Sequence, residues 1–200
     1  MPSLSYRYKD ALYLNITNRC FCNCSFCLRR ETSSVGEADS LWLDHEPTAE
    51  EVINDLKSYD LSEFSELVYC GFGEPFSAYD VMLEIARWLK AQPNCPRIRV
   101  NTNGLGNLIT GRNTEPELRG LVDVLSISLN APTPEYYVEL CRPAFGLDAL
   151  PAIIVFTREA KRFVPEVILT IVDVLSPEQV EACRRIAVDI GVPLRIRSRV

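Results

Sequence analysis

Apolar and polar residues alternate along several short stretches of the chain, and this alternation predicts strands with two unlike faces. In one stretch, Leu125, Ile127 and Leu129 fall on one face, and Ser126 and Ser128 fall on the other. Similar stretches recur along the chain. We therefore expect six strands, near Ala11–Thr17, Glu66–Gly71, Arg97–Asn101, Asp123–Leu129, Glu166–Asp173 and Leu194–Ser198.

Helix start signals lie between the predicted strands. Thr48, Thr114 and Ser176 each stand three residues before a glutamate or glutamine, which is the pattern of a capping box. Thr133 followed by Pro134 is a further start signal, and Gly191 is a stop signal. Helices that alternate with strands predict a mostly parallel sheet.

The polar face of the strands helps to choose between two architectures. A doubly wound sheet is covered on both faces, so its strands are apolar throughout. A filled barrel would carry branched apolar residues inside. We therefore predict an α/β fold, a partial (β/α)6 TIM-like barrel whose interior is polar. A sheet with one face in open water is the alternative.

Length and composition predict a single folded domain over residues 1–200. The chain is 47% hydrophobic and 24% charged, as in ordinary globular proteins. Its net charge of −6 argues against broad nucleic-acid binding. We see no apolar run of about 18 residues and no signal peptide, so we expect a cytoplasmic protein with no membrane segment. Three arginines near the end, Arg195, Arg197 and Arg199, either bind an anionic substrate in the interior or lie on a solvated edge.

Four of the eight cysteines lie within eight positions: Cys20, Cys22, Cys24 and Cys27. In a reducing compartment such a cluster indicates metal ligands rather than disulfides. Thiolates are soft ligands that suit iron–sulfur clusters, zinc or cuprous copper. The spacing C-x3-C-x2-C supplies three thiolates, which can hold a [4Fe–4S] cluster and leave its fourth iron open to a cofactor.

Two other metal sites fit the same cysteines. Four thiolates could hold zinc, although structural zinc sites use two pairs of ligands separated by a longer loop. An ordinary [4Fe–4S] electron carrier uses four cysteines, and Cys22 would then be the fourth ligand.

The cysteine segment resembles the motif C-x3-C-x-aromatic-C of the radical S-adenosylmethionine (radical SAM) superfamily, with Phe26 as the aromatic residue. The resemblance implies an enzyme whose [4Fe–4S] cluster is held by Cys20, Cys24 and Cys27. It further implies that S-adenosyl-L-methionine is cleaved there to a 5′-deoxyadenosyl radical, which acts on a substrate that the resemblance does not identify. The alternative function is an iron–sulfur electron-transfer or sensor protein that does not cleave the cofactor.

Two further segments carry the resemblance. The segment 69–75 is similar to the G-G-E-P motif of the family, with Phe72 in place of the first glycine, and 101–104 is similar to its T-N-G motif. Taken singly, these residues also fit ordinary strand ends and turns. The resemblance implies that the cofactor is bound by Phe26, Gly71, Gly73, Glu74, Pro75, Asn101, Asn103, Ser128, Asn130, Asp173 and Ile196.

Within the superfamily, the chain is most similar to a small subfamily encoded beside TatD-type hydrolases. The stretches that carry this likeness are 14–20, 70–75, 126–131 and 140–143. The resemblance implies an electron donor such as flavodoxin or ferredoxin, and a functional link to a TatD-type hydrolase. We interpret Cys141 as a buried small residue, and Trp42 with Leu43 as either a lid over the barrel or a loop anchor.

Overall fold

The computed structural model describes residues 2–198 and contains one seven-stranded sheet in which the strands lie in sequence order. Neighbours from β2 to β7 are parallel, and β1 pairs antiparallel with β2. The six predicted strands are therefore confirmed. The strands are β1 (Ser5–Tyr8), β2 (Ala11–Leu14), β3 (Glu66–Tyr69), β4 (Arg97–Thr102), β5 (Val124–Ser128), β6 (Glu166–Val172) and β7 (Leu194–Arg197).

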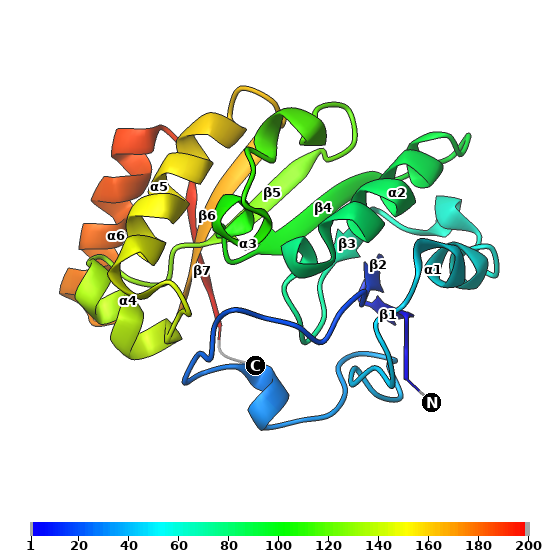
Figure 1. Cartoon of the computed structure of the whole chain (residues 1–200), viewed down its shortest axis with the longest axis horizontal. Coiled ribbons are helices and arrows are strands. Elements are labelled where there is room, and N and C mark those ends of the chain that lie inside the picture. Colours follow the sequence, from blue (N-terminus) through cyan, green and yellow to red (C-terminus); the bar gives the residue numbers. More distant parts are fainter. Residues whose placement is uncertain (1, 199–200) are drawn as a thin grey trace.

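Helices connect the parallel strands and lie along one side of the curved sheet, while the segment between β2 and α1 crosses the other side (Figure 1). Among the described residues the sheet is open, because β1 and β7 are its two edges. This arrangement confirms a partial barrel. The helices are α1 (Ala49–Leu56), α2 (Tyr79–Lys90), α3 (Gly106–Thr110), α4 (Pro134–Cys141), α5 (Ala149–Ala160) and α6 (Pro177–Ile190), with short 3-10 turns η1 (Leu28–Arg30), η2 (Leu61–Glu63), η3 (Pro75–Ala78), η4 (Glu115–Leu118) and η5 (Gly146–Asp148).

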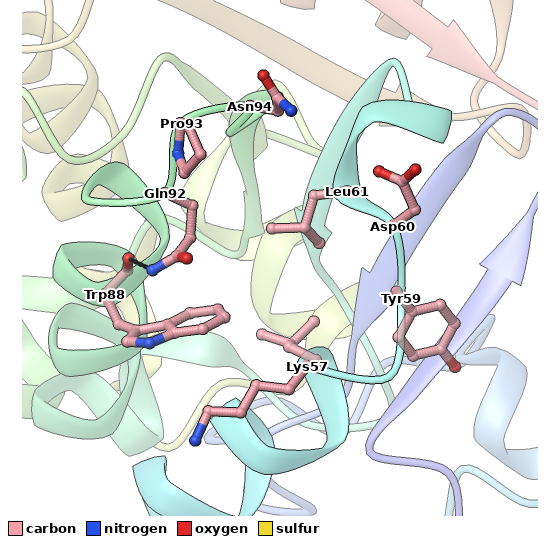
Figure 2. A pocket seen from close by; sticks show the side chains of 9 residues that line it. Lys57, Tyr59, Asp60, Leu61, Trp88, Gln92, Pro93 and Asn94 are labelled. Atoms are coloured by element: carbon pink, nitrogen blue, oxygen red, sulfur yellow. Dashed lines mark hydrogen bonds between the residues drawn. The ribbon is translucent and has the colours of Figure 1, made fainter.

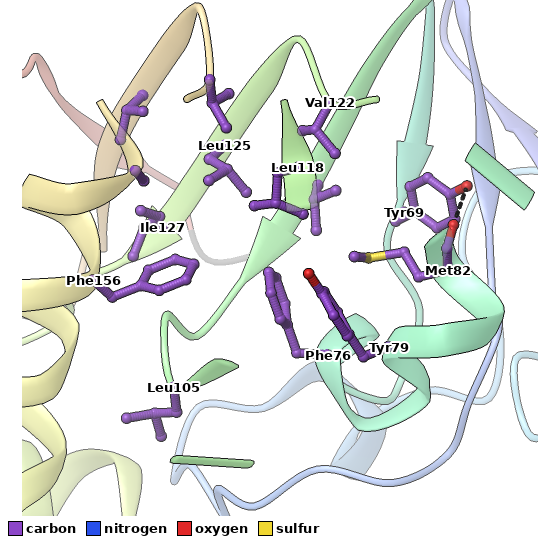
Figure 3. Close-up of a cluster of buried hydrophobic side chains, with 14 of the residues drawn as sticks. Tyr69, Phe76, Tyr79, Met82, Leu105, Leu118, Val122, Leu125, Ile127 and Phe156 are labelled. Atoms are coloured by element: carbon purple, nitrogen blue, oxygen red, sulfur yellow. Dashed lines mark hydrogen bonds between the residues drawn. The ribbon is translucent and has the colours of Figure 1, made fainter. Parts of the chain in front are cut away.

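The apolar face of the strands packs under the helices, as the alternation predicts. Leu125 and Ile127 of β5 are completely buried there, beside Phe156 of α5 and Phe76 of η3 (Figure 3). The rings of Phe76 and Phe156 meet edge to face, with centroids 5.6 Å apart. Each fully buried side chain of this size stabilises the fold by about 1.5–3 kcal/mol. The core therefore lies between sheet and helices, and the inner face of the sheet is left for polar groups.

Two of the three predicted capping boxes are present. The hydroxyls of Thr48 and Ser176 accept hydrogen bonds from the third residue of α1 and α6, and the reciprocal side-chain bonds are also formed. The prediction at Thr114 was wrong, because its side chain caps no helix and only the short turn η4 follows. Its hydroxyl instead donates to the amide oxygen of Asn107, 2.8 Å away, and Asn107 in turn donates to the buried carboxylate of Glu115.

The first strand, β1, was not predicted. It is four residues long and turns into β2 through Lys9, whose backbone is left-handed at φ 57°. Tight hairpin turns of this kind usually contain Asn-Gly or Asp-Gly. Because Lys9 and Asp10 carry no such signal, the hairpin could not be recognised from the sequence. No helix within residues 2–198 combines the length and apolar character needed to cross a membrane.

Candidate functional site

The cysteine loop leaves the carboxyl end of β2 and docks against the end of α4. The backbone amide of Asn23 donates to the carbonyl of Cys141 at 3.0 Å, and that of Ser25 donates to the carbonyl of Leu140 at 2.9 Å. From the other side, the amide of Ala144 donates to the carbonyl of Phe21 at 2.8 Å. These backbone bonds hold the loop across the mouth of the barrel.

The four cysteines of the loop have different surroundings. Cys20, Cys24 and Cys27 are half-buried, whereas Cys22 is only 5% exposed and belongs to the hydrophobic core. The Cys22 sulfur lies 3.9 Å from the Tyr137 hydroxyl, and the side-chain amide of Asn103 approaches it to 3.8 Å. The three cysteines of the C-x3-C-x2-C pattern are therefore the more accessible ones, and the extra cysteine is turned into the protein.

Hydrogen bonds among the thiols set their acidity. The bond from Cys22 lowers the pKa of Cys20, and bonds from Cys141 and then Cys22 lower the pKa of Cys24 to about 4. Cys22 and Cys141 donate their protons in these bonds. Their own pKa values are therefore raised. Burial raises the pKa of Cys27. The prediction that Cys141 is buried is confirmed. The structure adds a hydrogen bond from its thiol to that of Cys24, which was not predicted.

The donor set suits an iron–sulfur cluster, because one short loop carries three partly exposed thiols and soft thiolates are the usual ligands of such a cluster. Within residues 2–198 no three cysteine, histidine or acidic side chains already converge as a finished metal site. A cluster would therefore draw the three thiols together, which couples binding to local folding of the loop.

The segment after β3 packs closely against the base of the cysteine loop. A Cβ atom on Gly73 would lie 2.2 Å from the carbonyl oxygen of Thr17, and one on Gly71 would lie 2.0 Å from the side-chain oxygen of Asn15. The amide of Glu74 donates to the carbonyl of Arg19 at 2.8 Å. A side chain at position 73 would collide with the backbone of Thr17, and one at position 71 would collide with the side chain of Asn15, so the packing of the protein itself requires glycine at both positions.

The carboxylate of Glu74 joins the ends of β3 and β4. It accepts hydrogen bonds from the Thr102 hydroxyl and the Asn103 amide, both at 2.7 Å, and from the Phe76 amide at 3.2 Å. The side chain is 3% exposed, and burial raises its pKa to about 7 against the effect of these bonds. Pro75 follows it as the first residue of η3. Glu74 thus positions the loop that carries Asn103 beside Cys22.

Other predicted cofactor-binding residues line the same end of the sheet. The side-chain amide of Asn130 approaches the Cys141 sulfur to 3.8 Å, and its backbone is left-handed at φ 53°. Ser128 accepts a hydrogen bond from Arg197, and Asn101 bonds to the Cys70 thiol. These residues come from β4, β5 and the turn after β5, so the fold brings them together.

Three predicted residues stand apart from this group. The side chain of Phe26 packs against the hydrophobic core. Asp173 is exposed just beyond β6, where its backbone amide donates to the carbonyl of Arg197. The side chain of Ile196 is 45% exposed and, by register with buried Ile171, faces the helix side of the sheet. Only the backbone of Ile196 is therefore able to face the interior.

Phe72, which replaces a glycine of the family motif, anchors the segment that follows the cysteine loop. It is 6% exposed and belongs to a second apolar cluster with Tyr6, Ala38 and Leu41. Trp42 meets its ring at 61°, with centroids 5.0 Å apart. Trp42 therefore acts as part of a loop anchor over the inner face.

A cavity of about 380 Å³ runs along the inner face of the sheet, from the amino end of β2 and β3 to the cysteine loop. Cys27, Cys70, Gly71 and Phe72 contribute to its lining at one end. A separate hollow of about 270 Å³ lies outside the barrel, between the ends of α1 and α2, where Lys57 and Trp88 face each other (Figure 2). The inner cavity is the one that touches a predicted cluster ligand.

Several lining residues were not predicted as site residues, namely Tyr13, Cys70 and Arg99. The alternation of the strands does place Tyr13 and Arg99 on the polar face, and this was the available signal. The pairing of Cys141 with Cys24 had no signal in the sequence, because it depends on how α4 packs beside the loop.

Solved structures that share this fold include the following three proteins. A radical SAM methyltransferase from Sphaerobacter thermophilus has a TM-score of 0.61 and 18% identity, over 97% of this chain and 68% of that one. SuiB from Streptococcus suis, bound to S-adenosylmethionine, has a TM-score of 0.59 and 13% identity, over 94% and 38%. TsrM from Kitasatospora setae, with cobalamin and a [4Fe–4S] cluster bound, has a TM-score of 0.55 and 13% identity, over 89% and 32%. The chain thus spans less than half of the latter two proteins.

A search among curated proteins found no matching sequence. A comparison with known protein families matches residues 14–172 to the radical SAM superfamily. This match runs from the end of β2 to the end of β6 and includes the cysteine loop, the Gly73–Pro75 turn and the inner face of the sheet. The members of this family are enzymes that bind a [4Fe–4S] cluster and S-adenosylmethionine. The chain therefore belongs to the radical SAM superfamily.

Proposed function

We propose that Cys20, Cys24 and Cys27 hold the [4Fe–4S] cluster in this chain, and that a small substrate reacts in the cavity along the inner face of the sheet. The observation that carries the proposal is the contrast among the four cysteines of the loop. The three motif cysteines are partly exposed, and Cys27 lines the cavity, whereas Cys22 is buried against Tyr137 and Asn103.

With the cluster bound, the site would supply reductive cleavage of S-adenosylmethionine to a 5′-deoxyadenosyl radical, which takes a hydrogen atom from substrate. The residues of the chain bind and orient the reactants and exclude water. Asn101, Ser128 and Asn130 offer polar groups on the inner side, and Gly71 lines the cavity while it packs against the side chain of Asn15. Glu74 acts as a positioning residue through Thr102 and Asn103.

The finer resemblance, to the subfamily encoded beside TatD-type hydrolases, is also part of the proposal. It is supported by the stretches 14–20, 70–75, 126–131 and 140–143. We propose a cytoplasmic enzyme with flavodoxin or ferredoxin as the electron donor. The three structural relatives do not indicate a substrate for this chain.

The test compares two cysteine variants after anaerobic reconstitution. Cys22→Ala should retain about four irons per chain and form 5′-deoxyadenosine under dithionite, because the three ligands remain. Cys24→Ala should lose both the iron and the product. If Cys22→Ala loses iron as completely as Cys24→Ala, Cys22 is a fourth ligand and the protein is an electron carrier. Air-stable zinc in place of iron would refute the enzyme mechanism.

A further inference from the structure

The cavity along the inner face is strongly cationic, although the whole chain has a net charge of −6. Its lining contains five cationic side chains against two acidic ones, Asp10 and Glu66, an excess of three positive charges. An acidic protein that concentrates cations in one hollow favours anions at that place. The cationic residues are Lys9, Arg29, Arg99, Arg195 and Arg197.

Of the three arginines singled out in the sequence, Arg195 and Arg197 lie on β7, and Arg199 lies outside the described residues. Arg195 is exposed and Arg197 is partly buried. Their register partners, Thr170 and Val172, are alternate residues of β6, so both arginines lie on one face of the sheet. Arg195 donates to the Ser126 hydroxyl at 3.4 Å, and Arg197 donates to the Ser128 hydroxyl at 3.3 Å. Neither forms an ion pair with a carboxylate among residues 2–198.

The surroundings of Arg197 are those of a binding group rather than of a solvated edge. Its Nε atom is buried and has no hydrogen-bond partner within the described part of the chain. Burial lowers the pKa of Arg197 and outweighs the opposite effect of Cys70, and the charge of nearby Arg195 lowers it further. A buried guanidinium donor without an acceptor is costly, and no ion pair with a carboxylate of the described residues offsets that cost. An anion bound to the rest of the guanidinium would neutralise its charge.

Arg99 of β4 contributes a similar donor from further round the sheet. Its guanidinium pairs with Glu66 at 2.9 Å, yet its Nε atom is also buried without a partner among the residues described. Two strands thus contribute arginines to the lining of one cavity, and each arginine keeps one buried donor without a partner. The planar fork of arginine suits carboxylate and phosphate groups.

The β1–β2 side of the cavity is aromatic. Tyr6, Tyr8, Tyr13 and Phe72 line it, and the rings of Tyr6 and Tyr13 lie 5.3 Å apart. A ligand held by the arginines would place its remaining atoms against these rings. The volume of about 380 Å³ lies within the range of small-molecule sites.

We propose that this cavity binds a small organic anion, whose carboxylate or phosphate group is held by Arg195 and Arg197 with help from Arg99, and whose apolar or planar body lies against Tyr13. The inference rests on the proposed function, because the bound anion would be the molecule that reacts beside Cys27. The cavity also contains Gly71 and Asn101, which the resemblance assigns to the cofactor. The proposal therefore requires that the anion and S-adenosylmethionine bind at the same time.

The test measures binding of three probes that share one ring: benzoate, phenyl phosphate and the neutral benzyl alcohol. Titration calorimetry is done on the cluster-loaded protein with saturating S-adenosylmethionine. We expect at least one anion to bind about 10- to 100-fold more tightly than benzyl alcohol, the range that a charge-assisted hydrogen bond provides. Comparison of benzoate with phenyl phosphate then decides between a carboxylate and a phosphate group.

Substitutions of single arginines show where in the protein the anionic probe binds. Arg197→Gln should weaken anion binding by a similar factor, and Arg197→Lys should weaken it less because the charge remains. Arg185→Gln removes the same charge from an exposed position on α6 and should leave binding unchanged. Unchanged anion affinity in both folded Arg197 variants, or equal affinity for benzyl alcohol, overturns the inference. Anion binding that is seen only when S-adenosylmethionine is left out also overturns it, because the arginines would then belong to the cofactor.

Formation of 5′-deoxyadenosine is measured on the same samples. Cofactor cleavage without anion binding refutes the anion site and leaves the proposed function intact. Anion binding without cleavage refutes the proposed function and supports the anion site. The two hypotheses therefore fail separately.

Discussion

Replacement of Glu74 by glutamine separates the two forces that act on this buried carboxyl group. Burial favours the neutral acid, whereas the hydrogen bonds from Thr102, Asn103 and Phe76 favour the ionised form. Burial is the larger effect, and it raises the pKa of Glu74 from 4.5 to about 7. The free energy of unfolding should therefore fall as the pH rises through the pKa of Glu74, by an amount set by the size of the pKa shift.

A carboxyl group whose pKa is higher in the folded state than in the unfolded chain binds its proton more tightly when folded. Its stabilising contribution is complete below pH 4.5 and is lost as the pH rises through about 7. The shift from 4.5 to about 7 corresponds to about 3 kcal/mol, because one pKa unit is about 1.36 kcal/mol. About 2 kcal/mol of this loss falls above pH 5.5.

Urea denaturation of the metal-free, fully reduced protein measures this effect at a series of values from about pH 5.5 to pH 8. The stability of the wild type minus that of Glu74→Gln should fall by about 2 kcal/mol over this range, because glutamine does not titrate. Glu178→Gln is the control. The Ser176 hydroxyl lowers the pKa of exposed Glu178, so its difference should stay flat. A flat or rising difference for Glu74 would show that hydrogen bonding outweighs burial and would refute the reasoning.

Two backbone and packing predictions follow from the same region. Gly73→Ala should destabilise the protein by about 1–3 kcal/mol and hinder cluster assembly, because its Cβ would lie 2.2 Å from the Thr17 carbonyl oxygen. Gly111→Ala, where a Cβ meets no atom within 4 Å but the backbone is left-handed, should cost only about 1 kcal/mol; equal urea midpoints for the two variants would contradict this. Phe72→Ala should cost about 3–5 kcal/mol and speed proteolysis between residues 32 and 46, since its ring anchors that segment. Unchanged cleavage rates would show that the anchor lies elsewhere.

Local patterns in the sequence determined much of the architecture. The alternation of strands such as β5 depends only on which face is buried, so it could be predicted together with the curved, open sheet. The caps at Thr48 and Ser176 are also local, because both partners lie within three residues. The cysteine spacing likewise pointed to the cluster loop. Thr114 shows the limit, since a distant amide, that of Asn107, took the hydroxyl that a cap would have used.

Only the tertiary structure decided which groups meet inside the barrel. Cys22 and Cys24 are two positions apart, yet Cys22 is buried beside Tyr137 and Cys24 stays partly exposed. Arg99 and Arg197 are almost a hundred residues apart in the chain, and the curvature of the sheet brings both to one cavity. Such contacts depend on the packing of whole elements and on the burial of charge. Neither quantity is carried by the residues within one turn or one strand.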